Sequence, residues 1–390
     1  MSNNALSNRY KFRMTTGRFA LLCIFLLAAF AGAYRYNTGL GVTNLNDAYP
    51  WGLWILVDLA ATAFACVGFS MTLLSRIFYK KEYGIFTRKA VLIALLSYGL
   101  VMMVLIIEVG RWENFWRPLV SPGIDSPMFG VLTCMLCYVG LLFVEVVEIV
   151  SEKIAPNVHC FLQKLLPIIV ILVCSIPLSY QAYLGSLYFA MDGKLDLLWA
   201  SRVLPILFVL SAFMVGPVVS ILEDLWSAKR YKREVNLALL HRLSRVSAYG
   251  MIVFFIIRII DLAVRGQIAR LFSGVGLMML LELLLISVIP VIVSFTSFGK
   301  TKLGLQVFGF SALFGLILSR GNVIFTGMYE SLGGGYFPSW VEIITTIGLV
   351  TLMTLVYILL TENFSFFHVT EGKHANLSAK EDSDIFEEAI

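Results

Sequence analysis

The stretch WILVDLAATAFACVGFSMTLLSRI, residues 54–77, is an apolar run that carries a carboxylate, Asp58, in its second turn. About twenty apolar residues suffice for a helix to cross the ~30 Å hydrocarbon core of a bilayer. Such runs are too long and too continuous for the strands of a transmembrane barrel. The chain has further runs of this kind, which predict an all-α integral membrane protein with about ten transmembrane helices, at 19–34, 54–77, 90–108, 128–150, 165–190, 203–222, 246–264, 275–297, 303–318 and 340–360.

The composition agrees with a membrane protein. Of the 390 residues, 14% are charged and 59% are hydrophobic, whereas a soluble domain is roughly 25% charged. The net charge of +5 would suggest nucleic acid in a soluble protein, but here we read it as loop charge that orients the chain. We therefore expect no nucleic-acid partner.

Lys and Arg are distributed unevenly between the two sets of loops. The set that includes both termini holds 21 of them and the opposite set holds 8. Because basic loops resist translocation, both termini are predicted to be cytoplasmic. We expect a cytoplasmic segment at 1–18, a transmembrane domain at 19–360 and a cytoplasmic acidic tail at 361–390. Cleavage of the first helix as a signal peptide, near Ala31–Ala33, is an alternative that would leave nine helices.

A short internal similarity suggests how the helices are grouped. The segment Ile106–Arg111 resembles Ile259–Arg265, four helices later. Such a repeat predicts two four-helix bundles, helices 2–5 and helices 6–9, with helices 1 and 10 at the flanks.

Polar side chains within the helices gather in the outer third of the predicted membrane. Each charged group there costs ~2.5–3.5 kcal/mol on insertion scales, so each needs a reason. Buried ion pairs that fix helix packing are one interpretation, and proton handling is the other. The residues are Asp58, Glu108, Arg111, Tyr180, Gln181, Arg258, Asp261 and Glu282. Glu145 and Glu148, near the inner end of the fourth helix, would extend a proton path inward or lie as carboxylates at a helix end.

The outer loops 43–54, 110–118 and 333–340 are rich in tryptophan. An aromatic belt at the headgroups explains part of this pattern. Trp226 is the single tryptophan of the inner loops, however, so we also expect a docking surface or an apolar ligand pocket on the outer side.

The sequence gives little support for an intrinsic metal centre. The four histidines, His159, His241, His368 and His374, fall in predicted inner loops or the tail, whereas a b-type haem needs facing ligands within a bundle. Cys134 and Cys137 lack the further cysteines of an iron–sulfur cluster. We expect no haem, no cluster and no metal site.

The chain resembles the polysulfide reductase NrfD-like family, in particular its ten-helix group with the membrane subunit of HybB-type hydrogenases. The likeness runs from the first helix to the last. It is carried by Leu45–Asn46, Pro50–Ile55 with Asp58, Glu108–Arg111, Gln181 with Leu184–Leu187, Arg258 with Asp261, Glu282, and Gly333–Trp340.

The resemblance implies a cofactor-free, quinone-reactive membrane anchor in the cytoplasmic membrane of a bacterium or archaeon. Menaquinone would bind exchangeably among the helices, and a ferredoxin-like subunit with 4Fe-4S clusters would dock on the outer face. Multihaem cytochrome c, hydrogenase or other membrane subunits are the further partners that it implies. Relatives of the hydrogenase type tend to carry His where this chain has Tyr180, although a phenol can also donate a hydrogen bond.

These observations give a hypothesis for each site residue. Trp51, Trp54 and Trp112 wall a quinone slot, and Arg111, Tyr180 and Gln181 bind the quinone carbonyls. Asp58, Glu108, Asp261 and Glu282 carry protons, with Arg258 holding Asp261 ionised, and Glu145 and Glu148 form an inner proton path. A secondary transporter and a purely structural anchor without quinone chemistry are the alternatives.

Overall fold

The computed structural model describes residues 14–364, apart from Ala48, Tyr79, Phe115, Pro122, Ile124, Ala190, Asp192, Lys232 and Gly334. Within this part the chain is helical and contains no strand. The prediction of an all-α membrane protein with ten spanning helices is confirmed. The domain boundaries at 1–18 and 361–390 fall largely outside the described residues and stay predictions.

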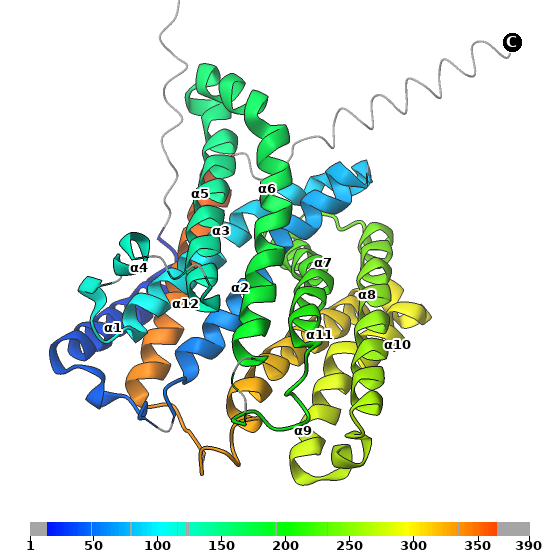
Figure 1. Cartoon of the computed structure of the whole chain (residues 1–390). Coiled ribbons are helices and arrows are strands. Elements are labelled where there is room, and N and C mark those ends of the chain that lie inside the picture. Colours follow the sequence, from blue (N-terminus) through cyan, green and yellow to red (C-terminus); the bar gives the residue numbers. More distant parts are fainter. Residues whose placement is uncertain are drawn as a thin grey trace, which may run out of the picture.

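Ten long helical segments cross the molecule (Figure 1). They are α1 (Thr16–Thr38), α2 (Leu53–Thr72), α3 (Gly84–Glu108), α5 (Pro127–Ile154), α6 (Pro156–Phe189), α7 (Leu204–Tyr231), α8 (Leu237–Val264), α9 (Gly274–Leu283) with α10 (Ile289–Phe295), α11 (Lys302–Gly321) and α12 (Trp340–Asn363). A short helix, α4 (Arg117–Val120), lies in the connection between α3 and α5.

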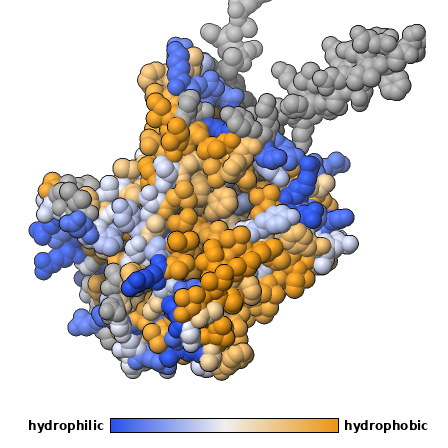
Figure 2. Space-filling model, turned by 45° about the vertical axis from the view of Figure 1, so that its right-hand side comes forward, coloured by the Kyte–Doolittle hydropathy of each residue, from blue (hydrophilic) through white to orange (hydrophobic). Residues whose placement is uncertain are grey.

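The two ends of the bundle can be told apart by the connections that they carry. We call the end at which α1 begins and α12 ends the terminal face, and the opposite end the cavity face. The cavity face carries the connections 39–52, 109–126, 190–203, 265–273 and 327–339. Between the two faces the surface is broadly hydrophobic, with hydrophilic side chains at the margins (Figure 2).

Helix α2 is the most enclosed of the ten spans. It packs against α3, α6, α7, α11 and α12. Small residues allow this close approach: a Cβ on Gly68 would lie 2.8 Å from Cβ of Ala94 in α3, and one on Gly216 of α7 would lie 2.5 Å from Oγ of Ser70. The run that opened the sequence analysis is therefore the central helix.

The helix contacts do not separate the molecule into two halves. α2, α3, α5 and α6 contact one another around a ring, as do α7, α8, α10 and α11, while α1 packs mainly on α12. However, α2 and α7 pack on each other as extensively as neighbours within each ring. The grouping into two four-helix bundles stays a prediction.

Two features of the helices were not predicted from hydropathy. α5 and α6 form a hairpin that extends beyond the other helices on the terminal face (Figure 1), because the helical backbone begins at Pro156, well before the apolar run at 165. Wide π-helical turns also occur in three spans: Leu284–Val288 interrupts its span, whereas Leu73–Ile77 and Asn322–Thr326 end theirs.

A buried ionic group ties three helices together near the terminal face. Lys89 of α3 is 4% exposed, and its Nζ lies 2.6 Å from Glu223 and 2.9 Å from Asp224 of α7. The Tyr357 hydroxyl of α12 donates to Glu223 at 2.8 Å. Removing one partner of a buried pair leaves a charge without compensation, which is far more costly than losing an exposed pair.

We expect Lys89→Met to lower the free energy of unfolding by ~3–5 kcal/mol, because Glu223 loses the cation that lies 2.6 Å from it and Asp224 is left to its pair with Arg233. Equilibrium denaturation of the purified chain in mixed detergent micelles measures this change. The neighbouring Arg88→Met is the control: its pair with Glu152, at 2.7 Å, is more exposed and is worth ~0–1 kcal/mol. Equal losses in the two variants would contradict the assignment.

Candidate functional site

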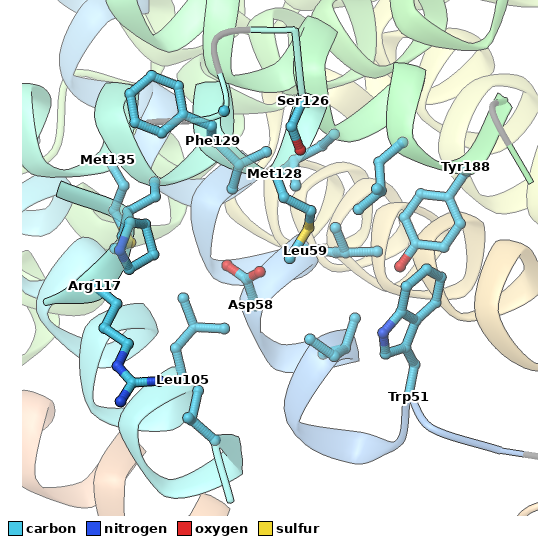
Figure 3. Close-up of a pocket in the computed structure, with 18 of the residues that line it drawn as sticks. Trp51, Asp58, Leu59, Leu105, Arg117, Ser126, Met128, Phe129, Met135 and Tyr188 are labelled. Carbon is cyan, nitrogen blue, oxygen red and sulfur yellow. The ribbon is translucent and has the colours of Figure 1, made fainter. Parts of the chain in front are cut away.

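A cavity of about 660 Å³ opens among α2, α3, α5, α6 and the connection 109–126 (Figure 3). Its lining is mostly aliphatic, aromatic and methionine side chains. They include Ile55 and Leu59 of α2, Leu105 of α3, Met128, Phe129, Leu132 and Met135 of α5, and Leu184, Leu187 and Tyr188 of α6. The size and the apolar lining are typical of a site for a small organic ligand.

One carboxyl group is present among the described residues that line this cavity. Asp58 of α2 is 4% exposed, and Figure 3 shows its carboxyl directed into the space between the labelled side chains. Its Oδ1 accepts a hydrogen bond from the Tyr180 hydroxyl of α6 at 3.4 Å. A buried carboxyl in an apolar pocket is costly, so Asp58 is the described residue of this lining for which a chemical role is expected.

An aromatic pair forms one wall. The rings of Trp51 and Tyr188 meet edge to face, with centroids 5.3 Å apart and an interplanar angle of 69°. Both residues are labelled on the same side of the cavity in Figure 3. Such pairs contribute ~0.5–1.5 kcal/mol beyond the burial of their area, which favours this arrangement of the two rings.

The loop before α2 is held in place by the loop before α12. The Tyr336 hydroxyl accepts from the Leu53 amide at 3.0 Å and donates to the carboxylate of Glu342. A Cβ on Gly52 would lie 2.4 Å from this hydroxyl, so the position requires glycine. Glu342 also accepts from the Asn44 amide at 3.2 Å. Much of the PWGLW and GGGYFPSW motifs therefore positions Trp51 rather than contacting a ligand.

Trp54, the second tryptophan of that motif, faces away from the cavity lining. Its indole is 1% exposed, and Nε1 donates to Oγ1 of Thr345 in α12 at 3.2 Å. The geometry gives Trp54 a role in packing α2 against α12.

Three tyrosines lead from Asp58 into the interior. Tyr180 packs edge to face on Tyr98, with ring centroids 5.7 Å apart, and Tyr98 packs in the same way on Tyr138, at 4.9 Å. All three side chains are fully buried. The hydroxyls of Tyr98 and Tyr138 have no hydrogen-bond partner within the described part of the chain.

A second, smaller cavity lies at the terminal face. It measures about 360 Å³ and is lined by polar groups that include Ser75, Arg76, Thr87, Glu145 and Glu148. Oε2 of Glu145 is buried without a partner among the described residues, whereas Oε1 of Glu148 lies 3.3 Å from Nδ1 of His159. The two inner carboxylates predicted from the sequence thus share one polar cavity.

The remaining predicted acids belong to a separate polar group in α8, α9 and α11. Asp261 is held by Arg265, through Nε at 3.0 Å and Nη2 at 2.5 Å, and by the Ser201 hydroxyl at 2.6 Å. Arg258 is more distant, with Nη1 3.9 Å from Oδ2. Arg265 therefore makes the close contacts with Asp261 that were expected of Arg258.

Glu282 and Gln181 are joined to this second group by hydrogen bonds from residues at the end of α11. Oε2 of Glu282 accepts from the Asn322 side chain at 2.9 Å and from the Trp199 indole at 3.4 Å. Nη2 of Arg320 donates to Ser211 at 2.9 Å and to Gln181 at 3.5 Å. Wide π-helical turns begin two residues after Glu282 and two residues after Arg320, and such turns occur frequently at functional sites.

Three further predicted residues lie near the end of α3. Glu108 has Oε2 buried without a partner in the described part of the chain, and its charge would interact with those of Asp58 and Glu342. Arg111 is exposed on the connection 109–126. The backbone of Trp112 lies in a short helical turn, but its side chain is outside the described residues. None of these three is among the described residues of the cavity wall.

The structure also brings residues to the cavity that were not singled out from the sequence. Tyr188 lies two turns beyond Tyr180 on the same helix, with Leu184 between them, so a helical period starting at Tyr180 would have found it. Arg117 contributes a cation to the lining from the short helix α4. Its contact depends on the path of the loop, which no periodicity reveals.

Comparisons with known proteins agree with this architecture. The family model "Polysulphide reductase, NrfD" matches residues 41–330. A probable Ni/Fe-hydrogenase 2 b-type cytochrome subunit of Escherichia coli is 28% identical over 358 residues, 89% of this chain and 90% of the relative. The integral membrane subunit of a menaquinone reductase from Nitratidesulfovibrio vulgaris is 28% identical over 236 residues, 54% of each chain.

A third relative matches over a shorter part. A protein of Halobacterium salinarum that is named as a membrane subunit of dimethyl sulfoxide reductase is 27% identical over 119 residues, 30% of this chain and 27% of the relative. The family model covers most of the chain, including the cavity and the second polar group. The protein is a multi-pass membrane protein that belongs to the polysulphide reductase NrfD family.

Proposed function

We propose that this chain is the quinone-reactive membrane subunit of a respiratory redox complex. It would exchange electrons between menaquinone, bound in the 660 Å³ cavity, and an iron–sulfur subunit on the cavity face. The observation that carries the proposal is an apolar cavity whose lining includes the buried carboxyl of Asp58, itself hydrogen-bonded to Tyr180. The family and the name of the menaquinone reductase relative support it.

Quinone reduction needs an apolar slot and a proton donor, and residues of the cavity can supply both. Reduction of a quinone consumes two electrons and two protons and yields the quinol; oxidation reverses both. The ring needs an apolar slot, which Trp51, Tyr188 and the aliphatic wall supply. A carbonyl oxygen that gains electrons needs a proton donor within hydrogen-bond reach, and Asp58, recharged through Tyr180, is the candidate.

The electrons would come from, or go to, a protein on the cavity face. The connection 109–126 lines the cavity and exposes apolar side chains there, with Trp116 56% and Val120 69% exposed. A ferredoxin-like subunit docked on this connection would bring a cluster close to the bound ring. The relatives named as hydrogenase and reductase membrane subunits support such a partner.

The protons would come from the terminal face. The polar cavity that holds Glu145 and Glu148 opens there. Tyr138 lies two turns from Glu145 on α5, and its ring contacts Tyr98, which in turn contacts Tyr180, the partner of Asp58. Hydroxyls both donate and accept, so with bound water this chain can relay protons. Quinone reduction would then consume protons from one side and electrons from the other.

The basic residues support the orientation. The loops on the terminal face, with the two terminal segments, hold most of the Lys and Arg. By the positive-inside rule, the terminal face would be cytoplasmic and the cavity face would lie outside the cytoplasmic membrane. Tyr336 on the cavity face is buried by the loop contacts that position Trp51, and this burial raises its pKa, so its hydroxyl keeps the proton that it donates to Glu342.

The name of the Escherichia coli relative includes a b-type cytochrome, so the expectation of no haem stays a prediction. Haem of this type needs two ligands that face each other. His159 on α6 is engaged with Glu148 and Gln163, and His241 lies on α8. These two described histidines lie on different helices, α6 and α8, and we derive no step through haem.

We expect Asp58→Asn to lower quinone-linked turnover of the assembled complex by about 10²-fold, the usual effect of losing a positioned proton donor. Turnover is measured in membranes with a soluble quinone analogue. Asp125→Asn is the matched control, because that carboxylate is exposed on the same face and outside the cavity lining. Full activity of the Asp58 variant, with the partner subunit still attached, would favour a purely structural anchor.

Filling the cavity tests binding separately from proton transfer. Leu132→Trp places a larger ring in the apolar wall, and we expect the purified complex to retain at least tenfold less menaquinone. Extraction and chromatography of the bound quinone measure it. Phe143→Trp, on the 60% exposed face of the same helix, should retain the wild-type amount. Unchanged quinone content in the Leu132 variant would show that menaquinone does not bind in this cavity.

The proton path can be tested by measuring from which side of the membrane protons are taken up. In vesicles with the terminal face accessible to a pH dye, Glu145→Gln should slow proton uptake during quinone reduction at least tenfold and leave bound menaquinone unchanged. The same substitution at Glu152, which is exposed and paired with Arg88, should have little effect. Wild-type uptake by the Glu145 variant would remove the inner carboxylates from the mechanism.

A further inference from the structure

A groove on the terminal face lies between the end of α2 and the beginning of α8. Its volume is about 590 Å³, and its lining combines basic and apolar side chains, among them Leu74, Phe78, Lys80, Arg245, Val246 and Tyr249. Nothing in the proposed quinone chemistry uses these residues. The groove lies where two helices end, which is the depth of the lipid headgroups.

The charge of the groove is positive. Arg242 is neutralised by Glu82, with Nη1 2.9 Å from Oε2, and this pair joins α8 to the short helix Lys81–Tyr83. Lys80 and Arg245 are exposed, and no ion pair involving either is found within the described part of the chain. The Arg245 guanidinium lies over the Phe295 ring, 5.2 Å from its centroid, which holds it at the rim.

The apolar part of the groove continues toward the hydrocarbon core. Phe78 is 57% and Tyr249 is 58% exposed, and the Tyr249 ring packs edge to face on Phe295, with centroids 5.5 Å apart. An occupant must therefore carry negative charge at one end and an apolar chain at the other. A soluble anion would leave the apolar part empty, and a zwitterionic lipid would bring its own cation to Lys80 and Arg245.

We propose that this groove binds an anionic phospholipid of the leaflet at the terminal face. A headgroup phosphate lies between Lys80 and Arg245, and an acyl chain follows Leu74, Phe78 and Val246. Basic pockets between transmembrane helices bind such headgroups elsewhere, and guanidinium groups suit phosphate geometry. The lipid would join α2, which carries Asp58, to α8 of the second polar group.

Native mass spectrometry of the full chain in detergent, with added phosphatidylglycerol or phosphatidylcholine, tests the proposal. We expect the wild type to retain phosphatidylglycerol at least fivefold better than phosphatidylcholine. Lys80→Gln/Arg245→Gln should remove this preference. The control Lys164→Gln/Lys302→Gln removes two exposed charges from the same face, outside the groove lining, and should keep it.

Val246→Trp separates the charges from the apolar part, because it blocks the groove while Lys80 and Arg245 remain; we expect phosphatidylglycerol retention to fall at least fivefold. A melting temperature equal to the wild type shows that each variant is folded. Equal retention of both lipids by the wild type, an unchanged preference in the Lys80/Arg245 variant, or displacement of the lipid by millimolar inorganic phosphate would overturn the proposal. Quinone turnover reports separately on the proposed function.

Discussion

A carboxyl group in the second turn of the most enclosed helix is the constraint on which this structure depends. A charged residue within the bilayer costs ~2.5–3.5 kcal/mol, and Asp58 is kept away from lipid because α2 is surrounded by other helices. That enclosure requires small residues along the α2 interfaces, such as Gly68 and Gly216. It also requires a polar partner at the same depth, and Tyr180 provides it. The need to keep the Asp58 carboxyl away from lipid thus accounts both for the central position of α2 and for the polar group in the cavity.

The number of helices and the place of each span were predictable because they follow from the length of apolar runs, which the bilayer thickness dictates. Several helix ends were not predictable: α6 begins at Pro156, α7 continues to Tyr231 and α8 begins at Leu237. Polar residues form these parts, and hydropathy does not report on helix outside the membrane. The π-helical turns were hidden for another reason: they depend on how a helix packs against its neighbours, and residues 284–288 and 322–326 look no different from their surroundings.

For the candidate site, sequence reasoning identified residue types and depth but not partners. Asp58 and Trp51 line one cavity, and Tyr180 donates a hydrogen bond to Asp58. Asp261, Glu282 and Arg258 have similar depth in the sequence but lie in a second group, with Arg265, Arg320 and Asn322 as their neighbours. The depth of a residue in the membrane follows from its position along its own helix. The neighbours that its side chain contacts depend on how all the helices pack together. The loop motifs illustrate the same limit, since Trp54 and Glu342 serve packing and capping.

The wide turn after Gly321 makes the cavity face depend on chain length as well as on residue type. An α-helix turns about 100° per residue, and the π-helical turn at Asn322–Thr326 holds one residue more than a regular turn. The carbonyl of Gly327, directly after it, accepts from the Asp196 amide at 2.6 Å and so joins the connections 190–203 and 327–339. Deleting one of the residues 323–325 would restore a regular turn and rotate the connection 327–339 by about 100° relative to α11, so this contact would be lost although every polar side chain of the second group was still present. In this family member, insertions and deletions within a membrane helix therefore carry functional information that substitutions alone do not.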